Sequence, residues 1–134
     1  MTDHIVRSYD AELESLRRGL AEMGGMSERM LGDSTVSLVR RDTALAQRVI
    51  SADQRLDNLQ REVEEKAVVT IARRQPMAND LRHVMTALRI AADLERIGDL
   101  AKNIAKRALA IAHESHPKPL MTGLGHMVEP ALKQ

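Results

Sequence analysis

The sequence contains no cysteine, phenylalanine or tryptophan, and its only aromatic residue is Tyr9. Without cysteine the chain can form neither a disulfide nor a thiolate metal site, which fits a reducing compartment. The near absence of aromatic side chains leaves almost no platform for stacking nucleic-acid bases. The core must therefore consist of Leu, Ile, Val, Ala and the eight Met, a composition that favours helix over sheet.

Long apolar runs are also missing, because no stretch approaches the roughly 18–20 residues of a membrane span. The first residues, Met1 to His4, lack the apolar segment of a secretory signal. The 20 basic and 19 acidic residues nearly cancel, so charge gives no general attraction to nucleic acid or anionic lipid. We therefore expect a soluble cytoplasmic protein that does not bind nucleic acid.

Apolar residues recur every three or four positions in three segments, residues 4–39, 43–74 and 77–114. This period predicts three long helices. Asp42 is placed to cap the second helix, and Pro76 ends it because proline disfavours helical geometry in the residue before it. Short connections make neighbouring helices antiparallel. We expect an all-α, antiparallel three-helix bundle over residues 1–114, followed by a linker over residues 115–119.

The apolar positions also predict which face of each helix lies toward the core. In the second helix the expected seam is Leu45, Val49, Ala52, Leu56, Leu59 and Val63. In the third helix it is Ala87, Ile90, Leu94, Ile97, Ala101, Ile104, Ala108 and Ile111. Both seams alternate steps of three and four residues, as packing in a helical bundle requires.

Residues 120–134 resemble the start of the chain. Aligning the two segments pairs Gly24 with Gly125 and Met26 with Met127. A match of this kind predicts a structural repeat of about 100 residues. Residues 120–134 are therefore interpreted as the truncated start of a second repeat.

One constellation carries possible chemistry. Glu95, Asp99 and Asn103 recur every fourth residue, which places three oxygen-bearing side chains along one line of a helix. Antiparallel pairing about Pro76 puts Asp57 level with Glu95, and Asp53 level with Asp99. Measured from the expected seams at about 100° per residue, all four carboxylates emerge together on the outer surface. Gly98, beside Asp99, leaves room for a close approach of the two helices.

Four carboxylates without Cys or His make a hard-oxygen site for a divalent or trivalent cation. Such ligands suit Mg²⁺, Mn²⁺, Ca²⁺ or iron rather than thiolate-bound zinc. The alternative is a solvated charged face on which Arg55, Arg96 and Lys102 form weak exposed ion pairs. A carboxylate-bridged metalloenzyme would add inward Glu-x-x-His ligands, which this sequence lacks. A purely structural bundle without metal is a further alternative.

The strings QPMANDLR (residues 75–82) and IAADLERIGDLAKNIA (residues 90–105) resemble the PhoU family of bacterial phosphate-transport accessory proteins. The resemblance extends over the whole chain and implies two similar three-helix bundles, of which this chain holds the first. It also implies surface metal sites built from Glu/Asp-x-x-x-Asp motifs. Asp53-x-x-x-Asp57 and Glu95-x-x-x-Asp99 match these motifs, and the matching pair of the second bundle is absent from the sequence.

The same resemblance implies a regulatory function rather than an enzymatic one, with no catalytic residues. Such a protein is expected to act as a cytoplasmic adaptor between the ATP-binding subunit of the phosphate ABC transporter and a membrane sensor histidine kinase. It would thereby act as a negative regulator of the phosphate-starvation response. The resemblance further implies a homodimer that reaches the membrane only through these partners, and metal ions (Mg, Mn, Fe or Zn) bound at the carboxylates.

Overall fold

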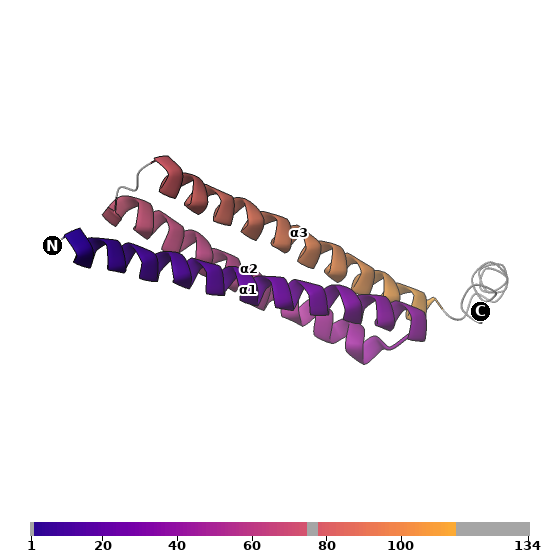
Figure 1. The fold of residues 1–134 in the computed structure, drawn as a ribbon. Coiled ribbons are helices and arrows are strands. Elements are labelled where there is room, and N and C mark those ends of the chain that lie inside the picture. The colour runs from indigo at the N-terminus through magenta and orange to yellow at the C-terminus, as the bar shows by residue number, and fades with distance from the viewer. Residues whose placement is uncertain (1, 75–77, 115–134) are drawn as a thin grey trace.

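The computed structural model describes residues 2–74 and 78–114, which form three long helices (Figure 1). The helices are α1 (Thr2–Arg40), α2 (Thr43–Arg74) and α3 (Ala78–His113). Figure 1 shows α1 and α3 running in one direction and α2 in the other. The prediction of an antiparallel, all-α three-helix bundle is thus confirmed. The turn at Pro76, the expected linker (residues 115–119) and the expected start of a second repeat (residues 120–134) lie outside the described residues.

The connection between α1 and α2 is short and hydrogen-bonded at both sides. Arg41 adopts a left-handed backbone conformation, with φ at 55°, and the amide of Asp42 donates a 3.0 Å hydrogen bond to the Ser37 carbonyl. The Asp42 carboxylate then accepts a 3.0 Å hydrogen bond from the amide of Leu45. A carboxylate in this position satisfies an amide that the first turn of a helix leaves unpaired. The predicted cap of the second helix is therefore confirmed.

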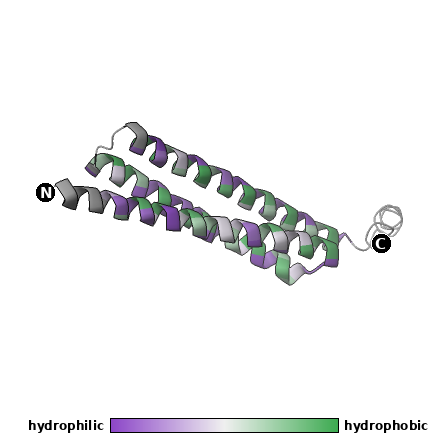
Figure 2. Cartoon of the chain, in the orientation of Figure 1, coloured by the Kyte–Doolittle hydropathy of each residue, from purple (hydrophilic) through white to green (hydrophobic). Residues whose placement is uncertain are grey.

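Each helix packs along the other two, and apolar and polar residues alternate along all three (Figure 2). α1 contributes several large side chains to the core, Leu16, Met23, Met26 and Met30. Unbranched methionine fills irregular space where aromatic side chains are missing. No helix among the described residues combines the length and apolarity needed to cross a membrane.

The seam of α2 differs from the expected one in an informative way. Its buried residues are spaced by three or four positions, apart from one step of seven between Leu56 and Val63, and are Ala46, Val49, Asp53, Leu56, Val63, Ala67 and Thr70. Leu45, Ala52 and Leu59 were expected in the seam but are only partly buried. At Leu45 and Ala52 the core-facing line therefore runs one position further along the helix, where Ala46 and Asp53 are buried instead. As a consequence it includes Asp53, a carboxylate.

The seam of α3 consists mainly of small residues. Its core-facing line contains Val84, Ala87, Ala91, Gly98, Ala101, Ala105 and Ala108. The expected seam was correct at three of its alanines but wrong at Ile90 and Ile97, which are 41% and 36% exposed. Small side chains let the helix axes approach closely, and this proximity turns the bulkier isoleucines to the flank of the interface. α3 thus lies close against α2, where the acidic residues are found.

Candidate metal centre

The four predicted carboxylates lie together on two adjacent helices. Asp53 and Asp57 belong to α2, and Glu95 and Asp99 belong to α3. Their charges act on one another across the interface, because Asp53 and Asp99 both affect the titration of Asp57. The structure therefore brings the predicted set together at one level of the bundle. The level pairing of the two helices, which was derived from Pro76, is correct to within about one helical turn.

Gly98 explains how α3 comes so close to α2 at this level. A Cβ atom at Gly98 would overlap the fully buried side chain of Leu56, and its next neighbours include the Met30 side chain of α1. Any larger residue would push the helices apart, because a packed interior cannot absorb such an overlap without moving. The expectation that Gly98 permits a close approach is confirmed. Gly98 lies between Glu95 and Asp99 in the sequence, so this contact sets their height against α2.

Asp53 is not on the outer surface, and the prediction that all four carboxylates are superficial is wrong for this residue. Asp53 is only 5% exposed, whereas Asp57 and Glu95 are partly buried and Asp99 is exposed. The reason is the shifted seam of α2, which turns Asp53 toward the neighbouring helix. The site is therefore graded from a buried carboxylate to an exposed one, rather than flat.

The buried carboxylate of Asp53 is paired through only one of its oxygens. Lys102 of α3 donates a hydrogen bond from Nζ to Asp53 Oδ2, at 3.1 Å, and forms an ion pair with it. The other oxygen, Oδ1, is buried and has no hydrogen-bond partner. A buried polar atom without a partner is costly, and native structures contain few of them. This oxygen is thus an unused acceptor that a ligand could occupy.

The neighbouring carboxyl groups are held in an unfavourable electrostatic environment. Burial raises the pKa of Asp57 above its ordinary value of 3.8, and the charges of Asp53 and Asp99 raise it further. Burial also raises the pKa of Glu95 above 4.5. The hydrogen bond with Asp99 and the charge of Asp99 raise this pKa further. Lys102 lowers the pKa of Asp57 but does not reverse these effects. A cation bound here would relieve the repulsion.

The donor chemistry fits a hard metal ion, although the carboxylates do not form a ready-made cage. Oxygen donors at Asp53, Asp57, Glu95 and Asp99 suit Mg²⁺, Mn²⁺ or iron. Within residues 2–74 and 78–114, however, no three His, Asp or Glu side chains are placed to hold one ion as they stand. Lys102 supplies the positive charge instead. Metal binding would therefore require carboxylate side chains to rotate and Lys102 to release Asp53.

The other basic residues near the cluster have different neighbours from those expected. Arg96 pairs with Asp93 at 3.1 Å on the exposed side of α3, and not with the four carboxylates. Arg55 lines a groove between α2 and α1. Lys102 was expected to make a weak exposed pair, yet its partner is the buried Asp53. The signal in the sequence was its spacing, since Lys102 follows Asp99 by three residues and lies on the same flank of the helix.

Comparisons with known protein families and sequences all indicate the same family. A family model described as the PhoU domain matches residues 20–108. The chain is 55% identical over 131 residues to the phosphate-specific transport system accessory protein PhoU homolog of Rhizobium meliloti (strain 1021). It is 40% identical over 124 residues to the phosphate-specific transport system accessory protein PhoU of Escherichia coli (strain K12).

These alignments cover 98% and 92% of the chain but 55% and 51% of the two relatives, so the chain spans about half their length. The crystal structure of PhoU from Pseudomonas aeruginosa superimposes with a TM-score of 0.78 at 34% sequence identity. That match covers 93% of this chain and 61% of the other. Sequence and fold thus agree over the same helices, and the chain belongs to the PhoU family.

Proposed function

We propose that this chain is one half of a phosphate-transport accessory protein and that its α2–α3 interface binds a metal ion. The names of its relatives support the first part, since they describe accessory proteins of phosphate-specific transport rather than enzymes. The observation that carries the second part is the buried Asp53 Oδ1 atom without a hydrogen-bond partner. Besides burial, the charges of Asp53 and Asp99 raise the pKa values of Asp57 and Glu95, which supports a shared acidic site.

In this proposal Asp53, Asp57, Glu95 and Asp99 hold the cation. Mg, Mn, Fe or Zn is the candidate ion, with the hard oxygen donors favouring the first three. The ion supplies positive charge that neutralises the repelling carboxylates and ties α2 to α3. Lys102 performs part of this function when no metal is bound, because its ammonium group already contacts Asp53 Oδ2.

A purely structural role is the second candidate, and the Lys102–Asp53 ion pair favours it. A buried carboxylate paired with a lysine can stabilise the register of two helices without a metal. The two candidates differ in what occupies Asp53. Metal binding competes with Lys102, whereas a structural pair is indifferent to added metal. A carboxylate-bridged enzyme has no comparable support, since the chain contains no Glu-x-x-His sequence.

The proposed cellular role is that of a cytoplasmic adaptor. The protein would link the ATP-binding subunit of the phosphate ABC transporter to a sensor histidine kinase, and thereby restrain the phosphate-starvation response. Exposed apolar side chains on α3, among them Ile90 and Leu100 at 41% and 52% exposure, support a surface covered by another protein unit. A second copy in a homodimer is one such unit.

Co-purification tests this adaptor role directly. The tagged chain is expressed with the transporter ATP-binding subunit or with the cytoplasmic part of the kinase, and each is assayed for retention. We expect both partners to be retained by the wild-type chain. Retention of neither partner, by a chain whose circular dichroism confirms the helical fold, would refute the adaptor role without bearing on the metal site.

A further inference from the structure

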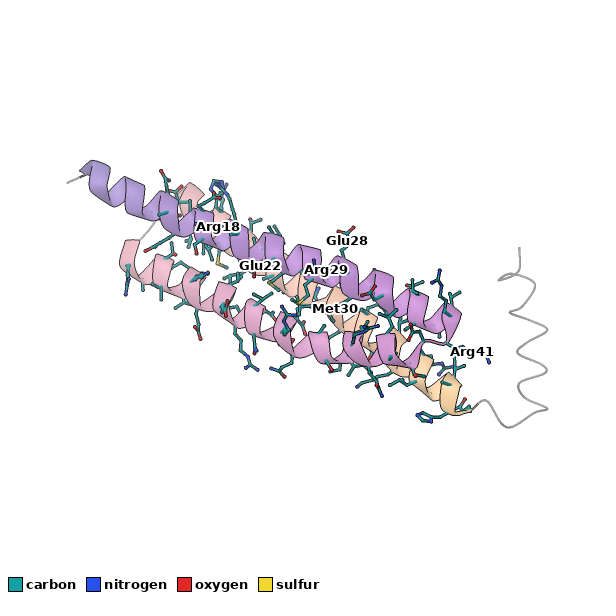
Figure 3. The ribbon with its side chains drawn as sticks, turned by 90° about the horizontal axis from the view of Figure 1, so that it is seen from below. Arg18, Glu22, Glu28, Arg29, Met30 and Arg41 are labelled. Carbon is teal, nitrogen blue, oxygen red and sulfur yellow. The ribbon has the colours of Figure 1, made fainter. Side chains whose placement is uncertain are left out.

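A second polar feature lies on the opposite side of α2 from the carboxylates, in the groove between α1 and α2. The groove has a volume of about 380 Å³. Its lining includes three buried core residues, Met26, Met30 and Val49. Arg29 of α1 and Arg48 and Arg55 of α2 line the same space. Figure 3 labels Arg29 and Met30 on the stretch of α1 that faces α2.

The three arginines have no partner among residues 2–74 and 78–114. None of Arg29, Arg48 and Arg55 makes an ion pair or a side-chain hydrogen bond in the part of the chain that the structure describes. Asp33 lines the same groove but pairs with none of them. Three guanidinium groups on the two walls of one groove, without a bound carboxylate, leave their donors free for an external anion.

The positive excess is confined to this stretch of the α1–α2 surface. Three arginines against one aspartate leave a net charge of +2 in the groove. The adjoining cavity toward the start of α1 shares Arg29 and Arg55 with the groove, but Glu22 and Glu62 line it as well and balance their charge. Nearer the start of α1, a further cavity is lined by Glu12, Glu62, Glu65 and Lys66, which together carry a net charge of −2. The chain as a whole carries only +1. The arginine groove is therefore a local feature and not the consequence of a basic protein.

The spacing of the arginines fits an anion with several oxygens. Arg48 and Arg55 are two helical turns apart, about 10 Å along α2, and Arg29 reaches the groove from the opposite wall. A guanidinium group is a planar fork that binds phosphoryl or carboxylate oxygens through paired hydrogen bonds. A carboxylate has two oxygens, and one arginine can bind both of them. A phosphoryl group has three oxygens and can therefore contact several arginines. A phosphate monoester also carries about −1.5 to −2 charges near pH 7.

We propose that the groove formed by Arg29, Arg48 and Arg55 binds a ligand through a phosphoryl group, as inorganic phosphate or as part of a larger phosphorylated molecule. The ligand lies between α1 and α2, with its oxygens on the arginines and its remaining surface over Met26 and Met30. This site shares no residue with the carboxylate cluster of α2 and α3. It is consequently independent of the proposed metal site.

A titration of the 134-residue chain tests the proposal. Two-dimensional NMR spectra of the backbone amides are recorded at each step of the titration. The probes are inorganic phosphate, pyrophosphate and ATP, added separately at constant ionic strength with a chelator present to exclude metal-mediated binding. We expect saturable shifts at residues lining the groove, with a dissociation constant of about millimolar for phosphate. Tighter binding of pyrophosphate or ATP would identify the larger ligand, and equal affinity would identify free phosphate.

Variants distinguish the groove from general charge effects. The double substitution Arg29→Ala with Arg55→Ala is expected to weaken binding at least about tenfold, since each arginine supplies charge-assisted hydrogen bonds. Arg18→Ala is the matched control, because Arg18 lies on the same helix beside a cavity that also contains Lys66, Glu22 and Glu62. It should change the affinity less than about twofold, as expected for an exposed charge.

Three results would overturn the proposal. One is the absence of saturable binding for all three probes, and another is an equal loss of affinity in the Arg18→Ala control. The third is saturable binding of a polyglutamate peptide in the groove with no response to any phosphoryl probe, which would assign the arginines to an acidic protein partner. All the arginines are exposed, so the variants should fold, and circular dichroism verifies this.

Discussion

Lys102 Nζ lies 3.1 Å from Asp53 Oδ2, and this ion pair joins α3 to the only carboxylate in the seam of α2 among the described residues. The side chain of Asp53 is 7% exposed and that of Lys102 is 31% exposed, so water screens the pair only in part. The pair holds a positive charge at the position where the neighbouring carboxylates would attract a metal ion. A metal ion at this site must therefore compete with the Lys102 ammonium group.

Replacing Lys102 by methionine removes the ammonium group but keeps the length and apolar stem of the side chain. In the presence of a chelator the variant should unfold at a lower temperature than the wild type, because Asp53 is left buried without a partner. Its affinity for Mn²⁺ should increase by about tenfold, since metal binding no longer breaks an ion pair. Thermal unfolding and calorimetric titration measure the two effects. An unchanged or weaker affinity for Mn²⁺ would show that Lys102 does not compete with metal.

The pH dependence of stability reports on Asp57 and Glu95. Both pKa values are raised in the folded chain, above 3.8 and 4.5, so folding favours the protonated carboxyl groups. Their contribution is therefore complete below the ordinary pKa values of 3.8 and 4.5 and is lost as the pH rises through the raised pKa values. Without metal, the variant Asp57→Asn with Glu95→Gln should melt about 1–3 °C above the wild type at pH 7.

That advantage should disappear well below pH 3.8, where Asp57 and Glu95 of the wild type are protonated in both the folded and the unfolded chain. The control is Asp93→Asn, which lies on the exposed side of α3 and pairs with Arg96. It should not reproduce the stabilisation at pH 7. A double variant that is less stable than the wild type at pH 7 would mean that the two carboxylates do not repel each other in the folded chain.

Gly98 allows a steric prediction with a matched control. Gly98→Ala places a methyl group against the buried Leu56 side chain and should destabilise the chain by about 1–3 kcal/mol. In Gly25→Ala the new methyl group has no neighbouring atom within 4 Å. This substitution should therefore stabilise α1 by up to about 1 kcal/mol. Chemical denaturation of both variants gives the two values. Equal effects of the two substitutions would refute the close packing of α3 on α2.

Asp42 allows a test of the α1–α2 connection. Asp42→Ala removes the acceptor of the Leu45 amide and should reduce the free energy of unfolding by about 1 kcal/mol. Asp42→Asn keeps an acceptor oxygen and should be nearly neutral. Urea denaturation of the two variants checks this difference. If alanine and asparagine were equally tolerated, the side-chain cap would contribute nothing to stability.

Much of the fold was predictable from the sequence, because each helix boundary depends on local chemistry. The three–four apolar period fixed the number of helices, and Asp42 and Pro76 marked the connections. The exact core face was less predictable. In α3, Ile90 and Ala91 are adjacent and both apolar, and only close packing determines that the alanine is buried.

The same limit explains the error at Asp53. A prediction from the apolar period places Ala52 in the core rather than its acidic neighbour Asp53. The expected seam of α2 therefore excluded the Asp53 carboxylate. The structure buries Asp53 because small residues on α3, with Gly98 among them, draw the two helices together there. The composition of the site was therefore visible in the sequence, whereas its depth and its pairing with Lys102 required the packed bundle.

The most direct test of the metal site is a calorimetric titration of chelator-treated, dialysed chain with Mn²⁺, carried out in parallel on wild type and Asp53→Asn. The proposed site predicts saturable binding to the wild-type chain and a loss of affinity of at least about tenfold in the variant. Asp93→Asn should bind as the wild type does. The absence of saturable binding by the wild-type chain, or binding that Asp53→Asn leaves unchanged, would contradict a metal centre at the α2–α3 interface.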